Sequence, residues 1–363
     1  MKSEIYSSML PTIAITMGDP AGIGPEIIVK SLSDKTVYER CKPLVVGDAG
    51  VMQRIVALLK LSCSINVVTR VCDAKFTFGT VDVFDLKNVP EAVEFGKVSV
   101  AAGNAAFEAV KKVIELAMAG EVDATVTAPI NKEAINMAGR HFSGHTEIYA
   151  HFTNTKKYAM LLAEEQLRVI HVTTHVSLRQ ACDLVKTARI LEVITLLDDA
   201  CRQLGIDKPK IAVAGLNPHS SDNGLFGWEE EREIIPAVQQ AKAKGYDVEG
   251  PIPADTMFSK AIGGKYDGCV AMYHDQGHIP FKVEGFKWSE EKKRMEVRGV
   301  NITLGLPIIR VSVDHGTAFE VAGKGIASEQ AMSIAIGYAV RMAQTRSKDR
   351  CSPPPNRGGR APA

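Results

Sequence analysis

Short apolar runs alternate along this chain with longer segments in which apolar residues recur every three or four positions. The runs have the length of strands, and the periodic segments have the spacing of amphipathic helices. Strands that alternate with helices are typical of an α/β protein with a largely parallel sheet. The expected strands are Thr12–Met17, Pro43–Val46, Val81–Leu86, Ala124–Ala128, Arg168–Thr173, Lys210–Ala214, Gly268–Met272 and Pro307–Val311.

The helical segments carry start and break signals. Ser328 is a favourable N-cap residue, and Glu329 follows in the first turn, where a carboxylate interacts favourably with the helix dipole. Pro236 predicts a kink or break in its segment, because proline lacks the backbone N–H. The expected helices are Val98–Met118, Thr187–Leu204, Glu229–Lys242 and Ser328–Gln344.

Length and local composition predict the domain organisation. The 363 residues exceed one ordinary hydrophobic core, so we expect two domains. The charged segment Phe286–Val297 is expected to form a solvated hairpin or loop. Residues 346–363 are rich in Pro, Gly and Arg and have few apolar side chains, which predicts a disordered tail.

Charge and cysteine content exclude several classes of protein. Lys and Arg number 43 against 42 Asp and Glu, a net charge of +1 that gives no basic footprint for nucleic acid or an anionic membrane. The seven cysteines are scattered and never spaced as Cys-x-x-Cys, which indicates reduced thiols. Without a signal peptide or a membrane span, the sequence favours a cytoplasmic protein.

Three histidines follow strand-like runs at polar turns. His274 lies in Tyr273-His274-Asp275-Gln276-Gly277-His278, directly after an apolar run, and His175 and His219 occupy similar positions. Ligands of α/β folds bind at such strand ends, and neutral imidazoles suit Zn, Co or Ni. Asp275 and Asp255 are candidate partners that orient the rings. Taken singly, each histidine is equally explained as a loop residue that satisfies one hydrogen bond.

Other residues indicate an anion site. His145 and Thr146 precede a helical stretch expected to start near Glu147, where free backbone amides suit a phosphate, although helix capping alone explains Thr146. Arg310 ends a predicted strand, and its guanidinium can bind a carboxylate or phosphate with two hydrogen bonds. Lys282 and Asn301 are further candidates. The glycine turn at 16–26 departs from the G-x-G-x-x-G dinucleotide fingerprint, so the cofactor-binding residues stay unknown.

Five separated motifs together resemble the 4-hydroxythreonine-4-phosphate dehydrogenase family, over about Pro11 to Met342. They are Met17-Gly18-Asp19-Pro20-Ala21-Gly22-Ile23-Gly24-Pro25-Glu26, Gly144-His145-Thr146-Glu147, Leu216-Asn217-Pro218-His219, Met272-Tyr273-His274-Asp275-Gln276-Gly277 and Gly299-Val300-Asn301-Ile302-Thr303-Leu304-Gly305-Leu306-Pro307.

The resemblance implies a homodimer of two-domain α/β/α subunits with largely parallel sheets, related to isocitrate and isopropylmalate dehydrogenases. The first domain would comprise 1–130 and 300–345, and the second, with the metal ligands and the dimer interface, 131–299. The active site would lie in the interdomain cleft, be shared across the dimer, and use NAD and one divalent metal (Zn, Mg, Co or Mn). No nucleic-acid or membrane partner is implied.

The resemblance also assigns roles to residues. His175 and His219 would bind the metal from one subunit, and His274 from the other. Lys282, Asp255 and Asp275 are the candidate catalytic residues, and the general base is not identified. The residues expected to hold the substrate and its phosphate are His145, Thr146, Lys282, Asn301 and Arg310.

Three departures from the vitamin B6 enzyme resemble the D-threonate and D-erythronate 4-phosphate dehydrogenases: Gly277-His278-Ile279-Pro280, the Phe286–Val297 insertion and the segment Thr317–Ala327. The implied reaction is oxidation of a CH–OH group followed by decarboxylation to dihydroxyacetone phosphate. The alternatives are 4-hydroxythreonine-4-phosphate dehydrogenase of pyridoxal phosphate biosynthesis, a three-histidine zinc hydrolase or lyase, and a non-catalytic phosphate-binding protein.

Overall fold

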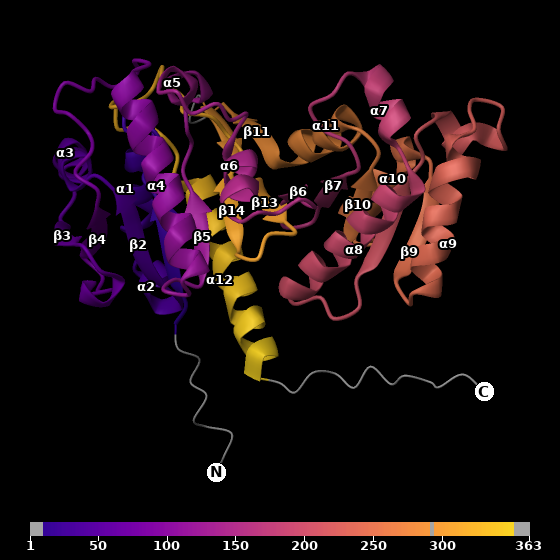
Figure 1. Ribbon diagram of the computed structural model, residues 1–363, viewed down its shortest axis with the longest axis horizontal. Coiled ribbons are helices and arrows are strands. Elements are labelled where there is room, and N and C mark those ends of the chain that lie inside the picture. Colours follow the sequence, from indigo (N-terminus) through magenta and orange to yellow (C-terminus); the bar gives the residue numbers. More distant parts are fainter. Residues whose placement is uncertain (1–9, 291–293, 352–363) are drawn as a thin grey trace, which may run out of the picture.

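The computed structural model describes residues 10–290 and 294–351, in which a 12-stranded sheet runs through the whole molecule (Figure 1). In spatial order the strands are β3 (Ser64–Val68), β4 (Thr80–Asp85), β2 (Lys42–Gly47), β1 (Thr12–Thr16), β5 (Ala124–Thr127), β14 (Arg310–Val313), β13 (Val300–Leu304), β6 (Ala159–Ala163), β7 (Arg168–His171), β10 (Gly268–Ala271), β8 (Lys210–Ala214) and β9 (Asp247–Ile252).

Two parallel blocks make up this sheet. The strands from β3 to β14 are parallel, and so are those from β7 to β9. Between the blocks, β13 is antiparallel to β14 and β6, and β6 is antiparallel to β7. The expected α/β class with a largely parallel sheet is confirmed, whereas the expected domain limits stay a prediction because one sheet serves both halves.

Helices cover both faces of the sheet. One face packs against α1, α12, α8 and α9, and the other against α4, α6, α10 and α11. The helices are α1 (Gly24–Ser31), α2 (Lys35–Arg40), α3 (Ala49–Leu59), α4 (Val100–Met118), α5 (Lys132–Met137), α6 (His145–Phe152), α7 (Leu178–Leu184), α8 (Thr187–Gln203), α9 (Ile235–Ala243), α10 (Ala254–Ile262), α11 (His274–Gly285) and α12 (Gln330–Cys351), with short turns η1 (Val71–Asp73), η2 (Pro218–Asp222) and η3 (Glu230–Ile234).

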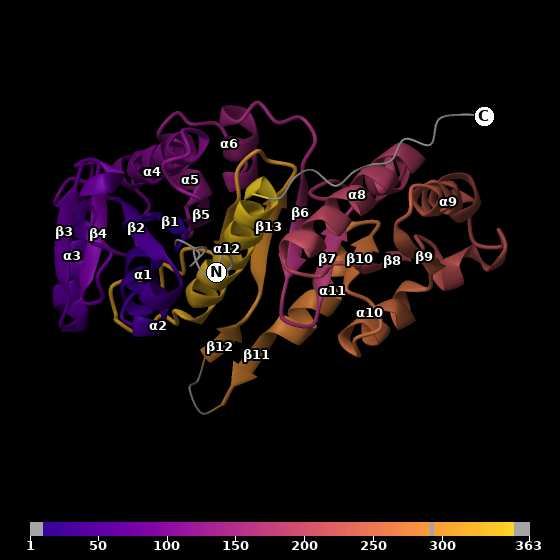
Figure 2. The same ribbon diagram turned by 90° about the horizontal axis from the view of Figure 1, so that it is seen from below.

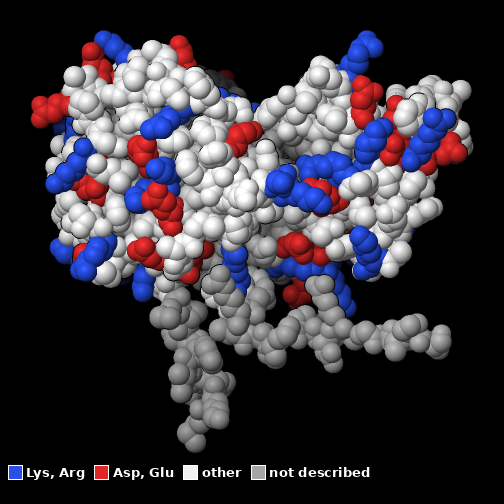
Figure 3. All heavy atoms as spheres, viewed as in Figure 1, with Lys and Arg blue, Asp and Glu red and all other residues white. Residues whose placement is uncertain are grey.

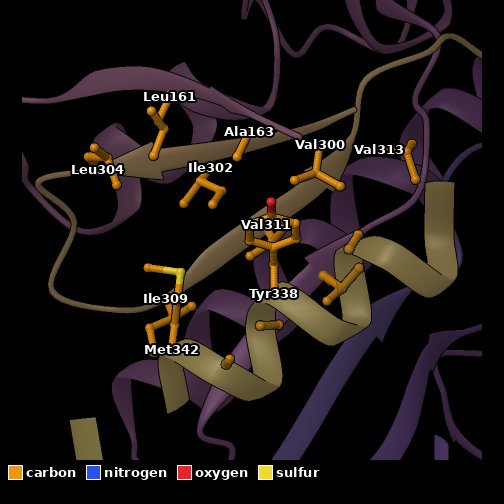
Figure 4. Close-up of a cluster of buried hydrophobic side chains, with 14 of the residues drawn as sticks. Leu161, Ala163, Val300, Ile302, Leu304, Ile309, Val311, Val313, Tyr338 and Met342 are labelled. Atoms are coloured by element: carbon orange, nitrogen blue, oxygen red, sulfur yellow. The ribbon is translucent and has the colours of Figure 1, made fainter. Parts of the chain in front are cut away.

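The centre of the core lies where α12 crosses the antiparallel strands (Figure 4). Tyr338 and Met342 of α12 face Val311 of β14 and the neighbouring side chains of β13 and β6, and all of these are buried. Burial of such side chains contributes roughly 1.5–3 kcal/mol each. This packing joins the two parallel blocks and so fixes the strand ends that carry the polar residues.

Most expected elements are found, with instructive differences. At the expected kink or break, the helical backbone is continuous but changes type: a π-helical turn, η3, ends at Ile234, and α9 begins at Ile235 with Pro236 in its first turn. The Phe286–Val297 segment is a hairpin of β11 (Phe286–Ser289) and β12 (Arg294–Val297) that projects from the body (Figure 2). In contrast to the expected tail from residue 346, α12 continues to Cys351; residues 352–363 lie outside the described part.

None of the helices in the described ranges is long and apolar enough to cross a membrane. The free thiols are those of Cys41, Cys63, Cys72, Cys182, Cys201 and Cys269.

Candidate functional site

The ends of β7 and β10 bring two of the three expected histidines together. The strands are adjacent and parallel, and the Thr173 hydroxyl donates to the Met272 carbonyl over 2.9 Å. His175 and His274 follow these strands and line one cavity of about 330 Å³, with ring centroids 5.8 Å apart. The resemblance implied that His274 binds the metal from the other subunit, which stays a prediction; within one chain its ring lies beside that of His175.

His219 lies apart from this pair. Its side chain is 65% exposed, and among the described residues no three His, Cys, Asp or Glu side chains form a metal-binding group. His219 begins a run of left-handed residues that ends at Asn223, and His175 is left-handed as well, with φ of 49°. Such conformations are uncommon outside glycine and concentrate at functional sites.

Aspartates orient two of the rings. Asp275 Oδ1 lies 2.7 Å from His274 Nδ1, and Asp222 Oδ2 lies 3.3 Å from His219 Nδ1. A carboxylate can only accept, so each Nδ1 carries the proton and each Nε2 offers a lone pair, as a metal ligand must. Asp275 therefore takes the expected orienting position. Asp255 does not take such a position, because it is exposed in the first turn of α10 and bonds no histidine in the described chain. The carboxylate that bonds His219 is instead that of Asp222, three positions later in the sequence.

The residues after His274 hold the start of α11 in place. The Gln276 side chain accepts from the Met272 N–H and donates to the Gly215 carbonyl, both over 2.7 Å, which ties the helix to the loop that leads to His219. A Cβ on Gly277 would lie 2.4 Å from His171 Nε2, so only glycine permits this close approach to β7. His278 packs its ring parallel to that of His274, with centroids 3.7 Å apart.

Buried Glu230, which the sequence did not single out, supports the loop before His219. Its Oε1 accepts from the backbone N–H groups of Leu216 and Asn217 over 2.7 and 2.8 Å, and its Oε2 accepts from the Asn217 side chain over 2.8 Å. Hydrogen bonds to an ionised group are stronger than neutral ones. Glu230 thus fixes the turn from which His219 extends.

A second cluster surrounds Arg310, the first residue of β14. Its guanidinium is 3% exposed and donates to the hydroxyls of Thr303 over 2.9 Å and Thr127 over 3.0 Å, but it has no carboxylate ion pair in the described chain. Burial lowers the pKa of Arg310 to about 10, while the nearby Tyr149 and Glu147 act in the opposite direction. The group therefore stays cationic near neutral pH. A buried cation without a counterion is costly, which favours an anionic ligand here.

Three other expected substrate residues lie on elements next to Arg310. His145 begins α6, and its Nε2 is buried without a partner among the described residues. Burial together with the charges of Arg310 and Lys132 holds the pKa of His145 well below the usual range. The Thr146 hydroxyl lies 3.4 Å from that of Thr303. On β13, Asn301 Oδ1 is also buried and unpartnered in the described chain. These unsatisfied polar atoms and Arg310 suit a phosphorylated ligand.

Asp314 connects the two clusters and was not expected from the sequence. It directly follows β14, and its buried Oδ2 has no partner among the described residues. Burial raises the pKa of Asp314 to about 6, and the nearby charges of Lys282 and His274 partly offset this rise. Lys282, an expected site residue, is exposed on α11 with its ammonium 5.1 Å from the Phe286 ring centroid. A polar residue at a strand end was the available signal for Asp314.

The histidine pair fits a divalent cation. Two imidazole rings that share one zinc ion at a bond length of about 2 Å have centroids about 5 to 6 Å apart, depending on the angle at the metal. The 5.8 Å between His175 and His274 lies within this range. The tautomer set by Asp275 leaves His274 Nε2 free to bind. Two ligands from one chain leave positions open for a third ligand and for substrate oxygens.

The molecular surface is consistent with a small-molecule ligand. Figure 3 shows acidic and basic side chains mixed over this face, and a hollow between the two lobes. No field of one sign covers this face, so attraction of an anion depends on local groups such as Arg310.

Known proteins resemble this chain over nearly its full length. A D-threonate 4-phosphate dehydrogenase of Salmonella typhimurium strain LT2 is 48% identical over 335 residues, 92% of this chain and 99% of that protein. The solved 4-hydroxythreonine-4-phosphate dehydrogenase of Klebsiella pneumoniae is 45% identical with a TM-score of 0.80, covering 92% and 99%. That of Burkholderia phymatum is 44% identical with a TM-score of 0.79, covering 92% and 98%.

The family model of the pyridoxal phosphate biosynthetic protein PdxA matches residues 39–339, which include both polar clusters and the strands of both blocks except β1. The chain therefore belongs to the PdxA family.

Proposed function

We propose that this protein is an NAD- and divalent-metal-dependent dehydrogenase that oxidises and decarboxylates a four-carbon hydroxy acid phosphate, D-threonate or D-erythronate 4-phosphate. The observation that carries the proposal is the buried Arg310 guanidinium, which has no carboxylate partner in the described chain. The histidine pair supports a metal-dependent reaction, and the relative in Salmonella typhimurium carries the name of the threonate enzyme.

Arg310 binds the phosphate with its planar guanidinium, and Thr127 and Thr303 hold that group in position. Neutral His145, Thr146 and Asn301 offer further polar atoms to the substrate, and Lys282 adds a positive charge from α11. A divalent cation held by the histidines would polarise the hydroxyl and carboxylate oxygens of the substrate.

The reaction removes a hydride from the carbon that bears the hydroxyl β to the carboxylate and transfers it to NAD. The hydroxyl proton passes to a base. The resulting β-keto acid loses carbon dioxide, and reprotonation gives dihydroxyacetone phosphate. Asp314 is our candidate for the base, because its Oδ2 is unpartnered in the described chain and it lies near Lys282 and His274. Asp275 acts through His274 rather than on the substrate.

The active unit is a homodimer. Helices α7 and α11, which flank the histidine cavity, expose Leu178 (62%), Ile279 (60%) and Val283 (68%), and the loop after His219 exposes Leu225 (73%) and Phe226 (48%). Apolar patches of this kind mark protein interfaces. Because His219 lies outside the pair within one chain, we assign the third metal ligand to the partner subunit's His219.

The alternative substrate is 4-hydroxythreonine 4-phosphate, for which the solved relatives are named. It differs from the threonate compound by an amino group in place of a hydroxyl. The two substrates place the same demands on Arg310, so the phosphate site does not distinguish them. A three-histidine hydrolase or lyase would need no nicotinamide at all.

One substrate panel tests the proposal. The purified protein is mixed with Mn²⁺ or Zn²⁺, NAD and each of D-threonate 4-phosphate, D-erythronate 4-phosphate and 4-hydroxythreonine 4-phosphate, and reduced nicotinamide and carbon dioxide are measured. We expect equal amounts of both products and the highest kcat/KM with a threonate or erythronate phosphate. A higher kcat/KM for the amino compound would overturn the substrate choice, and product formation without NAD would overturn the reaction class.

A further inference from the structure

Four histidine rings form a continuous row that includes the candidate metal ligands His175 and His274. The centroids of His175 and His274 are 5.8 Å apart, those of His274 and His278 are 3.7 Å apart, and those of His278 and His171 are 4.6 Å apart. The planes of His274 and His278 differ by only 10°, so the two rings are stacked face to face. His278 thus covers one face of the candidate ligand His274.

Two hydrogen bonds hold the His278 ring in this position. Its Nδ1 lies 3.1 Å from the carbonyl oxygen of His274, one helical turn earlier, and 3.1 Å from Nε2 of His171. A carbonyl only accepts, so Nδ1 of His278 carries the proton and His171 Nε2 presents a lone pair to it. His171 is 1% exposed at the end of β7 and cannot move without disturbing the sheet.

The backbone of α11 is shaped to permit these contacts. Gly277 lets the helix approach β7 so closely that a Cβ would lie 2.4 Å from His171 Nε2, 2.7 Å from Val169 Cγ1 and 3.0 Å from Ala271 Cβ. The ring of His274 is held on its edge by Asp275 and on its face by His278. Rotation of the His274 ring out of its plane would collide with His278.

We propose that His278, held by His171, is a positioning residue that fixes the plane in which His274 presents Nε2 to a divalent cation. The inference rests on the proposed function, because His274 is a ligand only if the protein binds a metal. Groups outside the ligand set that orient a ligand typically change metal affinity by about 10- to 100-fold when they are lost. Loss of His278 should therefore weaken metal binding while the ligand itself remains.

The test is metal binding to the metal-free full-length protein, with Zn²⁺ alone measured by calorimetry and Co²⁺ alone followed by its visible absorption. His278→Leu and His278→Asn are expected to raise the Kd for Zn²⁺ about tenfold and to change the Co²⁺ spectrum. His278→Phe keeps an aromatic face against His274, so its Kd should stay within about threefold of the unmodified protein. His151→Leu is the matched control, because His151 also packs against a ring, Phe152, at 5.0 Å but lies on α6.

Unchanged Zn²⁺ affinity and an unchanged Co²⁺ spectrum in the Leu and Asn variants would overturn the inference. If His278→Leu does not fold, the Zn²⁺ affinities of His278→Phe and His278→Asn are compared. Tighter binding by His278→Phe supports the positioning role, and equal or reversed affinities overturn it. His274→Ala distinguishes failure of the proposed metal site from failure of the positioning role of His278. Undiminished Zn²⁺ binding by that variant would overturn the metal site itself, whereas lost binding there with unaffected His278 variants would overturn only the positioning role.

Discussion

Arg310 is a buried cation whose hydrogen bonds in the described chain go only to hydroxyl groups. We expect Arg310→Met to raise the KM for the phosphorylated substrate about 100-fold, because the loss of charge-assisted hydrogen bonds to phosphate costs about 3 kcal/mol. Inorganic phosphate should raise the Tm of the unmodified protein but not that of the variant. Arg70→Met, which removes an exposed guanidinium paired with Asp73, should leave both properties unchanged; a phosphate-dependent Tm shift in Arg310→Met would contradict the assignment.

A single residue, Asp19, makes the free energy of unfolding depend on pH. Burial raises the pKa of this fully buried carboxyl from 3.8 to about 6, despite hydrogen bonds from the backbone of Ala21 and Asn131. The folded protein thus binds the proton more tightly than the unfolded chain. The contribution of this proton to the free energy of unfolding is fully present below pH 4 and is lost as the pH rises through about 6.

Asp19→Asn removes that ionisation while it keeps an acceptor for the Ala21 N–H. We expect the variant to gain stability relative to the unmodified protein as the pH rises from 4 to 7.5, by up to about 3 kcal/mol. Urea unfolding at both pH values measures the difference. Asp34→Asn is the control, because hydrogen bonds from Thr36 lower the pKa of that exposed carboxyl, so its contribution to stability is lost only below about pH 4 and the variant should change little between the two pH values. A difference that does not change with pH would show that Asp19 is not perturbed by burial.

At the scale of the element, the position of α11 depends on Gly277. Gly277→Ala places a methyl group against His171, Val169 and Ala271, and overpacking of this kind costs typically 1–3 kcal/mol. Gly285→Ala, at the other end of the same helix, meets nothing closer than 3.7 Å and should be neutral or slightly stabilising. Chemical unfolding of both variants checks this expectation. Equal stability of the two variants would mean that α11 is free to shift away from β7.

Hydrophobic patterning predicted the strands that are buried on both faces, since β1, β2, β5, β7, β8 and β10 read as continuous apolar runs. It missed β3, whose side chains are largely half-buried or exposed at the sheet edge, and β9, which contains Gly250 and Pro251. Strand β6 was missed because its run Ala159–Ala163 adjoins no recognised turn signal. The antiparallel centre depends on pairing between distant segments, which a local pattern does not encode.

The motifs predicted His274, His175, Arg310 and Asp275 as site residues, because each lies beside a strand end or a polar turn. Arg310 was expected to end a strand, whereas the structure places it at the start of β14. Sequence could not show that Thr127 and Thr303 hold Arg310, since these hydroxyls meet only through the register of β5, β14 and β13. The sequence also suggested Asp255 as a partner of the histidine rings. The position of Asp255 on α10 depends on how the chain folds, which its residue type does not show.

At the scale of the whole molecule, the proposed metal site needs residues from two chains. A heterodimer of one His175→Ala chain and one His219→Ala chain tests this requirement, because the two lesions fall in the same site if His219 crosses the interface. The other site is then intact, and we expect about half of the unmodified activity. The homodimers of each variant should be inactive. Activity of the heterodimer at their background level would place both ligands in one chain.

The most direct measurement is anomalous diffraction from a crystal grown with Zn²⁺. We expect one strong peak per chain, about 2.1 Å from Nε2 of both His175 and His274, with the partner subunit's His219 as the third ligand. A crystal without a peak at these rings, or with the ion bound elsewhere, would contradict the account.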